Sequence, residues 1–447
     1  MMPVILGSEN PQCQIPEVQS LVSKFTLYIG LISGILSAII SPKLGALSDR
    51  YGRTRMISLC TLGLLINEIV IICVARYSDV LSVKWILLGS VFDGLGGTFI
   101  AAMALSYAYA SDCTIPEKRN VVFGYYHGSL FAGIALGPIL AGYVVKATGN
   151  ILSVFYIALG LHSTFSLFLL LVVPESLTIE RQLKAREKKK DKDSVGGFGE
   201  QASQNWLSYL IRILKGGNLL APLAILWPTE PGTNPAVRHN LALLAAVDAT
   251  MFGVAMGSMY VILLYSEYAF GWGNFETSVF VSVVNICRVI TLLVLLPIIT
   301  RLMRGPVSGR SKRNSGSDRI DLGIIRTAIL TDLLGYVGYT LVRSGDLFIL
   351  CGAVAAIGGM GSPTLQAALT KHVPPDRTGQ VLGAMGLLHA SARVISPVIF
   401  NLIYAATVGK FTQTVFVCLA ATFGVAFGLS WFIKPHGKTP PADPLRR

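Results

Sequence analysis

The sequence predicts an all-α, polytopic membrane protein. Only 14% of its 447 residues are charged and 52% are hydrophobic, whereas soluble domains carry about 25% charged residues. Apolar runs of about 20 residues, the length that crosses a bilayer, recur along the chain. Because the hydrocarbon core offers no hydrogen-bond partners, a run that crosses it must be a helix.

Eleven runs are expected to cross a core about 30 Å thick, at about 1.5 Å of rise per residue. In chain order they are Val22–Pro42, Met56–Ala75, Trp85–Tyr109, Val121–Val145, Val154–Val173, Leu241–Tyr265, Thr277–Thr300, Leu322–Leu341, Leu347–Leu369, Val381–Thr407 and Thr414–Ile433. The residues before the first run are too polar and too rich in proline for a signal peptide.

A long polar connector divides these runs into two helical bundles. We expect a polar N-terminal segment (1–20), a bundle of five spans (21–174), a cytoplasmic linker (175–240), a bundle of six spans (241–434) and a basic cytoplasmic tail (435–447). The linker opens with a charge run of mixed sign, which is typical of a disordered segment or a frayed helix.

The middle of the linker has a different pattern. Apolar residues outnumber and partly surround Arg212 and Lys215 in the segment 206–215. This pattern favours a helix that lies on the inner membrane surface. Four prolines and a tryptophan follow between 222 and 235 and end any helix there.

Lysine and arginine are distributed unevenly between the two sides of the predicted bundle. If the connector 43–55 is cytoplasmic, the loops on its side hold 28 of these residues and the loops on the other side hold 5. This is a strong positive-inside bias, and it places the C-terminus in the cytoplasm. The net charge of +13 is therefore spread over membrane-proximal loops, which argues against a nucleic-acid partner.

A weak internal repeat indicates two related halves. The segment Pro116–Gly124 recurs as Pro375–Gly383, 259 residues further on, and both copies read Pro, acid, base and later Val, an apolar residue and Gly. The same offset carries Gly45 to position 304, inside the basic loop 301–319.

The connector Gly45–Arg55 has the form G-x-L-x-D-R-x-G-R-x-R and is predicted to form a tight turn between two spans. It resembles the signature loop between the second and third helices of the major facilitator superfamily. The resemblance implies two helical bundles that rock by alternating access around a central cavity. It also implies a conformational latch that docks near Thr378–Gln380. The latch residues would be Gly45, Asp49, Arg50, Gly52, Arg53 and Arg55.

The resemblance covers roughly residues 20–435, and one family feature is missing from it. The family has twelve helices, and its signature loop follows the second, whereas here it follows the first predicted span. We expect a shortened gene model or a fragment to explain the missing first helix, which lines the substrate cavity in this fold.

Two further motifs refine the resemblance. The segment Leu88–Gly97 is similar to the fourth-helix motif of the family, but Ser90 replaces its arginine and Asp93 its glutamine. The segment 133–142 is similar to the fifth-helix motif of antiporters; close helix packing around a proline kink would explain it equally well. The motif residues are Gly133, Gly137, Pro138 and Gly142. Together these motifs resemble the tetracycline-resistance type of drug:proton antiporter and its fungal and animal relatives.

Charged side chains inside the spans are candidates for a proton and substrate cavity. A charge at mid-bilayer costs at least about 2.5 kcal/mol, so each should face a cavity or a partner. The candidates are Glu68, Asp93, Asp248, Asp332, Arg288 and Arg393. Internal ion pairs that only fix helix register are the alternative, and the histidines of the spans are interpreted as core side chains.

The sequence thus predicts a secondary transporter that moves a small molecule, such as a drug or xenobiotic, by alternating access. The coupling ion is expected to be H⁺, carried by an intramembrane carboxyl such as Asp93. The seven cysteines show no metal-binding spacing and no enzyme motif occurs, so no metal, other cofactor or catalytic residue is expected. A monomer in the plasma or vacuolar membrane is expected. A non-transporting sensor on the same fold and an inactive fragment remain alternatives.

Overall fold

The computed structural model describes residues 16–195, 220–229, 234–304 and 316–435. Within these ranges every regular element is helical and no strand occurs. The surface helix proposed at 206–215 and one of the four linker prolines, Pro231, lie outside the described residues.

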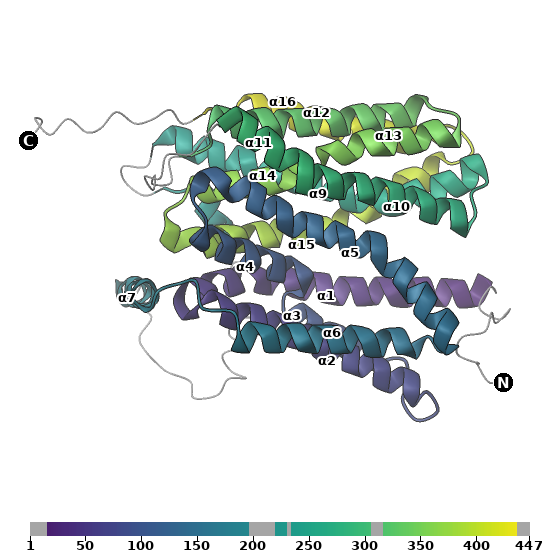
Figure 1. Ribbon diagram of the computed structural model, residues 1–447, viewed down its shortest axis with the longest axis horizontal. Helices are drawn as coiled ribbons and strands as arrows, with labels where there is room; N and C mark the ends of the chain where they lie inside the picture. Colours follow the sequence, from purple (N-terminus) through teal and green to yellow (C-terminus); the bar gives the residue numbers. More distant parts are fainter. Residues whose placement is uncertain (1–15, 196–219, 230–233, 305–315, 436–447) are drawn as a thin grey trace, which may run out of the picture. The chain divides into compact units, whose positions relative to one another are not determined.

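The first group of helices runs from the N-terminus to the linker (Figure 1). These helices are α1 (Pro16–Tyr51), α2 (Arg53–Arg76), α3 (Trp85–Leu95), α4 (Thr98–Cys113), α5 (Arg119–Thr148), α6 (Leu152–Leu171) and α7 (Ile179–Val195). The helices after the linker are α9 (Pro235–Phe270), α10 (Asn274–Ile290), α11 (Leu296–Arg304), α12 (Arg319–Leu341), α13 (Gly345–Ile357), α14 (Gly361–Lys371), α15 (Thr378–Thr407) and α16 (Thr414–Trp431).

Ten helical segments of the described chain are long and apolar enough to cross a membrane. They coincide with ten of the eleven predicted spans. The eleventh, Leu322–Leu341, forms the helix α12, but it is not among the ten. Arg326 and Asp332 lower its mean hydropathy, so this helix needs partners for its charges.

Three of the spans are interrupted. The chain bends between α3 and α4, where Gly97 has a φ of 80° and Thr98 a φ of 56°. A π-helical turn, Thr291–Leu295, joins α10 to α11. A short 3₁₀ turn, Gly358–Met360, joins α13 to α14. Such interruptions are frequent at functional sites in membrane helices.

The described chain groups into two compact units by its internal contacts. The described residues of unit 1 fall within 1–113, 148–228 and 375–390, and those of unit 2 fall within 114–147, 229–374 and 391–447. The predicted bundle boundaries follow chain order and stay a prediction. The contact grouping departs from chain order at α5, which lies in unit 2, and at the first part of α15, which lies in unit 1.

Glycines allow the close packing of α5 within unit 2 and of the first part of α15 within unit 1. A Cβ at Gly128 of α5 would lie 2.5 Å from Leu293, and one at Gly124 would lie 2.7 Å from Leu296. A Cβ at Gly383 of α15 would lie 3.1 Å from the Cα of Gly45. Small residues at these faces let the helix backbones approach closely, which is the usual adhesive in membranes.

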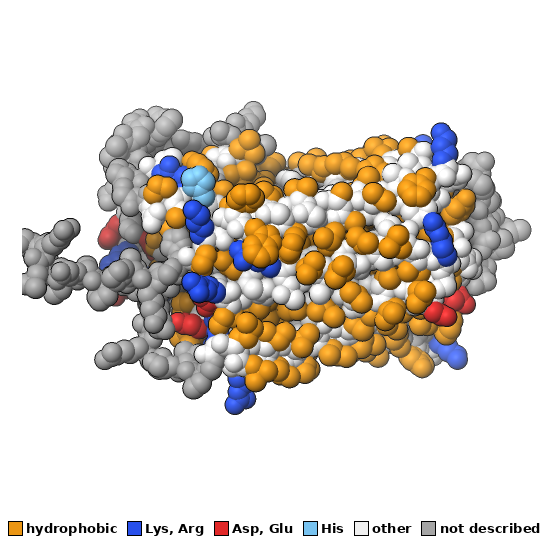
Figure 2. Space-filling model, turned by 90° about the horizontal axis from the view of Figure 1, so that it is seen from above, with side chains coloured by type: hydrophobic (Ala, Val, Ile, Leu, Met, Phe, Trp, Pro, Cys, Tyr) orange, Lys and Arg blue, Asp and Glu red, His pale blue; other side chains and the backbone are white. Residues whose placement is uncertain are grey.

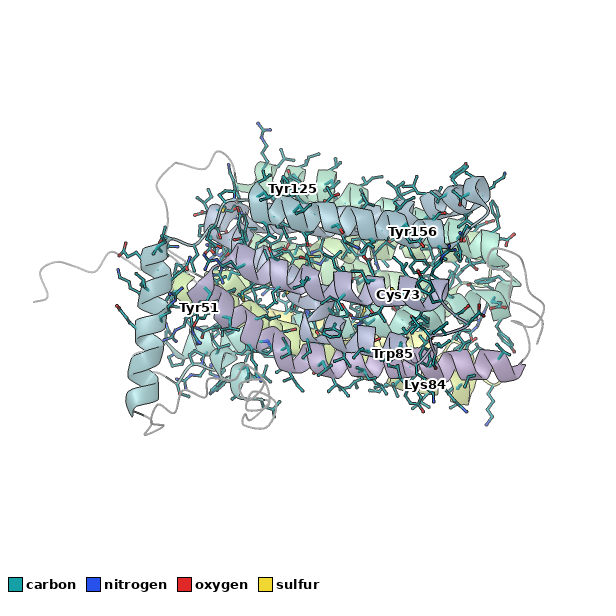
Figure 3. The ribbon with its side chains drawn as sticks, turned by 90° about the horizontal axis from the view of Figure 1, so that it is seen from below. Tyr51, Cys73, Lys84, Trp85, Tyr125 and Tyr156 are labelled. Atoms are coloured by element: carbon teal, nitrogen blue, oxygen red, sulfur yellow. The ribbon has the colours of Figure 1, made fainter. Side chains whose placement is uncertain are left out.

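The helices of the bundle expose apolar side chains along their lengths. Leu161 and Leu171 of α6, for example, are 67% and 79% exposed. On the face shown in Figure 2, hydrophobic side chains cover the middle of the helices, and most Lys and Arg side chains gather toward their ends. In unit 1, Figure 3 places Tyr51 at one end of the helices and Lys84 and Trp85 at the other. Both observations fit helices that cross a bilayer.

The charge run of the linker forms a regular helix, α7, where a disordered or frayed segment was the expectation. This helix runs across the ends of the unit 1 helices, and Figures 1 and 3 show it end-on and lengthwise. The Arg186 guanidinium fastens it, because its Nε donates to the carbonyl oxygen of Arg50 at 2.9 Å and the group lies 4.7 Å from the centre of the Tyr51 ring.

Candidate functional site

The predicted turn Gly45–Arg55 is mostly helix. α1 continues through Tyr51 and α2 begins at Arg53, so Gly52 alone makes the turn, with a φ of 103°. Only glycine adopts this conformation without strain. The tight turn is therefore confined to one residue, and the charged residues around it are held on two rigid helices.

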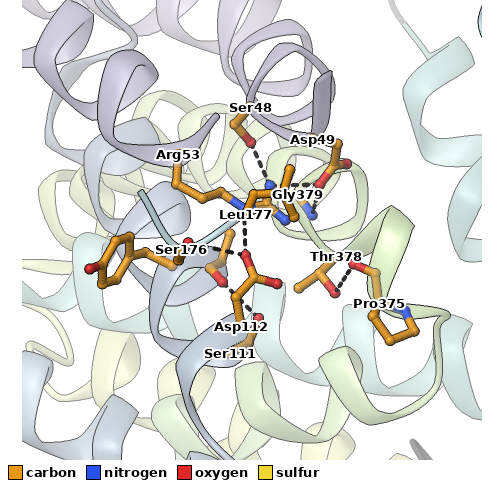
Figure 4. A network of polar contacts seen from close by, with 12 residues as sticks. Ser48, Asp49, Arg53, Ser111, Asp112, Ser176, Leu177, Pro375, Thr378 and Gly379 are labelled. Atoms are coloured by element: carbon orange, nitrogen blue, oxygen red, sulfur yellow. Dashed lines mark hydrogen bonds and ion pairs between the residues drawn. The ribbon is translucent and has the colours of Figure 1, made fainter. Parts of the chain in front are cut away.

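Arg53, the first residue of α2, is the centre of a buried polar network in unit 1 (Figure 4). Its guanidinium contacts Asp49 of α1 at 2.6 Å and Asp112 of α4 at 2.9 Å, and it donates to the Ser48 hydroxyl at 2.7 Å. The Arg53 side chain is fully buried. A buried guanidinium is tolerated only when carboxylates surround it in this way.

Asp49 extends the network to α15, 330 residues away in the chain. Its two carboxylate oxygens accept the backbone N–H groups of Gly379 and Gln380, each at 3.0 Å. These N–H groups belong to the first turn of α15, where N–H groups have no partner within their own helix and carry the positive end of its dipole. The carboxylate therefore binds a helix N-terminus, and this happens at the position where the resemblance placed the latch.

Glycines make room for this contact on both helices. A Cβ at Gly45 would overlap the carbonyl oxygen of Gly379, and a Cβ at Gly379 would overlap the guanidinium of Arg53. The two backbones thus touch directly beside the buried charges. This is the physical reason for the first glycine of the signature.

Glu175 follows α6 and caps the start of α2. Its carboxylate accepts the N–H of Arg53 at 2.8 Å, and both the N–H and the hydroxyl of Thr54, at 3.1 and 2.7 Å. A Cβ at Gly52 would overlap this carboxylate. Glu175 and Asp112 are thus parts of this network in addition to the predicted latch residues. In the sequence, each is an acid that shortly follows a predicted span.

The remaining bases of the signature lie outside the network. Arg55 is exposed and Arg50 is half-buried, and the helix α7 contacts the carbonyl oxygen of Arg50. A part in the latch stays a prediction for these two residues.

A second buried network lies in unit 2 and has the opposite charge pattern. Its centre is an acid, Asp321, in the first turn of α12. Asp321 contacts Lys371 at the end of α14, at 2.5 Å, and also Arg304 at the end of α11. Arg304 in addition contacts Asp318 at 3.1 Å and the carbonyl oxygen of Glu117, just before α5.

The repeat offset relates the two networks. Adding 259 to Asp112 gives Lys371. Asp112 lies at the end of α4, which precedes α5, and Lys371 lies at the end of α14, which precedes α15. In unit 1 a base at a helix start is held between two acids, and in unit 2 an acid at a helix start is held between two bases. Each arrangement neutralises charge that would otherwise be buried alone.

The predicted cavity residues of unit 1 have separate environments. Glu68 of α2 contacts His162 of α6, with 2.7 Å between Oε1 and Nδ1. His162 is therefore a partner of a candidate site residue and not an isolated core side chain. Asp93 is half-buried in the last turns of α3, just before the bend at Gly97.

The predicted cavity residues of unit 2 also fall into more than one place. Asp248 of α9 is fully buried and accepts hydrogen bonds from Gln366 at 2.5 Å and Ser362 at 3.4 Å. Asp332 of α12 is buried and interacts electrostatically with Arg288 of α10. Arg393 lies in α15, in the part of that helix that belongs to unit 2.

The antiporter-type motif of α5 is loosely surrounded. A Cβ at Gly133, Gly137 or Gly142 would meet no described atom within 4 Å, and Pro138 lies inside the helix. Close packing in this structure therefore does not require these three glycines. Their part in antiport stays a prediction.

The described residues hold no group of three or more His, Cys, Asp or Glu side chains placed to bind a metal ion. The chemistry available in the bundle is that of carboxylates, guanidinium groups, hydroxyls and one histidine–glutamate pair.

Spanning helices with interruptions near mid-span charges, and charged networks where helices end, define a transporter-type membrane protein. A model of the Major Facilitator Superfamily matches residues 19–397. The chain belongs to this family. It is an integral, multi-pass membrane protein of a transporter family rather than an enzyme family.

Named relatives support this placement. The chain is 31% identical to the MFS-type transporter avaJ of Aspergillus versicolor, over 95% of this chain and 79% of the relative. It is 24% identical to the class C tetracycline resistance protein of Escherichia coli, over 95% and 90% of the two chains. A solved structure of the human organic anion transporter MFSD10 shares the fold, with a TM-score of 0.68 at 18% identity, and covers 91% of this chain and 83% of its own.

We predict that Gly45→Ala destabilises the protein by about 1–3 kcal/mol, because the new methyl group overpacks the contact with Gly379. Gly30→Ala in the same helix is the matched control, since a Cβ there meets nothing within 4 Å. Thermal unfolding in detergent measures both. Equal melting temperatures for the two variants would contradict the close approach of α1 and α15.

We also predict that Asp321→Asn destabilises the protein by about 3 kcal/mol or more, because it leaves Lys371 and Arg304 buried without their shared carboxylate. The exposed pair Glu180–Lys184, with 2.6 Å between its charged atoms, supplies the control. Glu180→Gln should change stability by less than about 1 kcal/mol. A smaller loss for Asp321→Asn than for Glu180→Gln would show that the second network is not structural.

Proposed function

We propose that this protein is a proton-coupled secondary transporter that moves a drug-like small molecule across the membrane by alternating access. Membership of the family supports the transport function. The tetracycline resistance relative supports efflux of a drug or xenobiotic, and antiport with protons. A monomer in the plasma or vacuolar membrane, with its C-terminus in the cytoplasm, is the form we propose to be active.

The observation that carries the mechanism is the contact between Asp49 and the start of α15. A transporter that alternates between two states needs contacts that hold one state and break in the other. The carboxylate of Asp49 holds two N–H groups of another helix, and Arg53 in turn holds the carboxylate. Because a helix is rigid, loss of this contact frees the start of α15 to move together with the rest of that helix. Asp49 and Arg53 are therefore proposed as the latch of one state.

Proton coupling is proposed to use carboxyl groups inside the spans, with Asp93 as the main carrier. Asp93 lies beside the bend between α3 and α4, where the backbone already departs from a regular helix. The residue that replaces the family's arginine nearby, Ser90, is neutral, so that position supplies no base to neutralise the carboxylate. A proton on Asp93 removes a charge from the membrane interior and so lowers the cost of moving this segment between states.

For the coupling, we predict that Asp93→Asn lowers pH-gradient-driven tetracycline flux in proteoliposomes at least about tenfold. The amide keeps the size of the carboxyl but cannot exchange a proton with the medium. Asp79→Asn is the control, since Asp79 is an exposed carboxylate in the connector between α2 and α3. Unchanged gradient-driven flux in Asp93→Asn would rule out Asp93 as the carrier.

For the latch, we predict that Asp49→Asn shifts the inward/outward balance and slows transport by about tenfold. The neutral amide loses the charge-assisted bonds to Gly379 and Gln380, and each such bond contributes about 1.5–3 kcal/mol. Labelling of single cysteines placed at the two ends of the helices measures the balance. Asp346→Asn, which removes an exposed carboxylate, should change neither quantity. A normal balance and rate in Asp49→Asn would contradict the latch.

A further inference from the structure

Arg288 lies inside a predicted span, and no carboxylate of the described residues contacts its guanidinium. It lies near the middle of the span Phe275–Arg304, one turn before the π-helical segment Thr291–Leu295. Its Nε is enclosed by protein and has no hydrogen-bond partner. No described carboxylate oxygen lies within 4.0 Å of its guanidinium. An unpaired charge at this depth is costly, so a function is the expected reason for it.

Other arginines of the structure show what a satisfied guanidinium looks like. Arg53 and Arg304 also have one buried nitrogen without a partner, but each holds two carboxylates. Arg326 of α12 donates to the carbonyl oxygens of Ser430 and Ile433, at 3.3 and 3.4 Å. Arg288 has no comparable contact among the described residues.

The surroundings of Arg288 leave the edge of its guanidinium for a ligand. The Arg288 guanidinium lies over the Phe131 ring of α5, with the ring centre 5.0 Å from Cζ. The aromatic ring attracts the cation but offers no oxygen acceptor to its N–H groups. The turn between α13 and α14 passes beside the aliphatic part of the Arg288 side chain, where a Cβ at Gly359 would lie 3.6 Å from Cγ, an ordinary van der Waals distance.

Asp332 is close enough to influence this guanidinium but does not neutralise it by contact. Its buried carboxyl lies against Gly358, where a Cβ would overlap it, and it interacts with Arg288 only over a distance. No described group donates a hydrogen bond to it. The two charged groups therefore attract each other without forming a salt bridge.

We propose that Arg288 binds the carboxylate of an organic anion and that Phe131 packs against the apolar part of the same ligand. A carboxylate matches the planar N–H edge of a guanidinium with two parallel hydrogen bonds. An aromatic or aliphatic body suits the ring and the apolar walls of a membrane bundle. Asp332 repels this ligand and competes with it for the guanidinium. The inference rests on the proposed transport function, because it names the chemical class of the cargo.

The test uses two dyes with the same xanthene core and opposite charge. Fluorescein carries a carboxylate, and rhodamine 6G is a cationic ester. Binding to the full-length protein is measured in phosphatidylcholine nanodiscs by fluorescence polarisation. We expect wild type to bind fluorescein more tightly than rhodamine 6G. Arg288→Gln should weaken fluorescein binding about 10-fold to 100-fold and leave rhodamine 6G binding unchanged or stronger. Asp332→Asn should tighten fluorescein binding.

Arg326→Gln is the matched control, because it removes a guanidinium of the same unit that already has partners. It should change fluorescein binding by less than about twofold. Arg288→Lys keeps the charge and should retain part of the affinity, which separates loss of the ligand contact from misfolding. Size-exclusion chromatography checks the fold of each variant.

The outcomes separate this inference from the proposed function. Tight rhodamine 6G binding without fluorescein binding, or fluorescein binding that Arg288→Gln leaves unchanged, would overturn the anion site and leave the transporter proposal standing. Proton-driven flux that is absent for every dye overturns the transporter proposal, while Arg288-dependent fluorescein binding would still support the site. If added phosphatidylserine abolishes fluorescein binding, Arg288 binds an acidic lipid. That result would overturn the proposal that it binds a free organic anion.

Discussion

The architecture depends on the need to neutralise charge where water is absent. In unit 1 the guanidinium of Arg53 is fully buried and is stable because Asp49 and Asp112 approach it from two other helices. Asp49 in turn is held by two N–H groups of α15. Burying any one of these charged groups alone would cost free energy, but together they neutralise one another. The helix ends that carry them are therefore held in one arrangement. Loss of any member leaves the others without compensation, which is the property that a latch requires.

The second network shows that the geometry matters more than the sign of the charges. Asp321 stands at the start of α12 between Arg304 and Lys371, as Arg53 stands at the start of α2 between two acids. The two networks differ in how they contact a further helix, which is α15 in unit 1 and α5 in unit 2. In unit 1 a carboxylate accepts N–H groups at the positive end of α15, and in unit 2 a guanidinium donates to a carbonyl oxygen just before α5. The helix dipole favours the first contact and opposes the second, so the two ends are not equivalent in energy.

Against this background the incompletely paired groups stand out. Arg288 keeps an unmatched donor, and Asp332 faces it without contact. Arg288 lies just before the π-helical turn of its own span, and the Asp332 carboxyl lies against Gly358 in the 3₁₀ turn between α13 and α14. The charges of the two helix-end networks are in contact, whereas these two are apart, and this contrast is the basis for the proposed anion site.

The sequence by itself determined the class of the protein and ten of the spans, because hydropathy has the length scale of a bilayer. It also singled out Asp49, Arg53 and the glycines beside them, because the signature is contiguous, and it showed the repeat that relates Pro116–Gly124 to Pro375–Gly383. Only the tertiary structure decided which residues complete the site. Glu175 lies 122 residues from Arg53, and Asp112 lies 59 residues from it. The pairing of Glu68 with His162 and the separation of Asp332 from Arg288 are equally invisible in the chain order. The partner of a buried charge is chosen by how helices pack side by side, and packing brings together residues whose distance along the chain carries no signal.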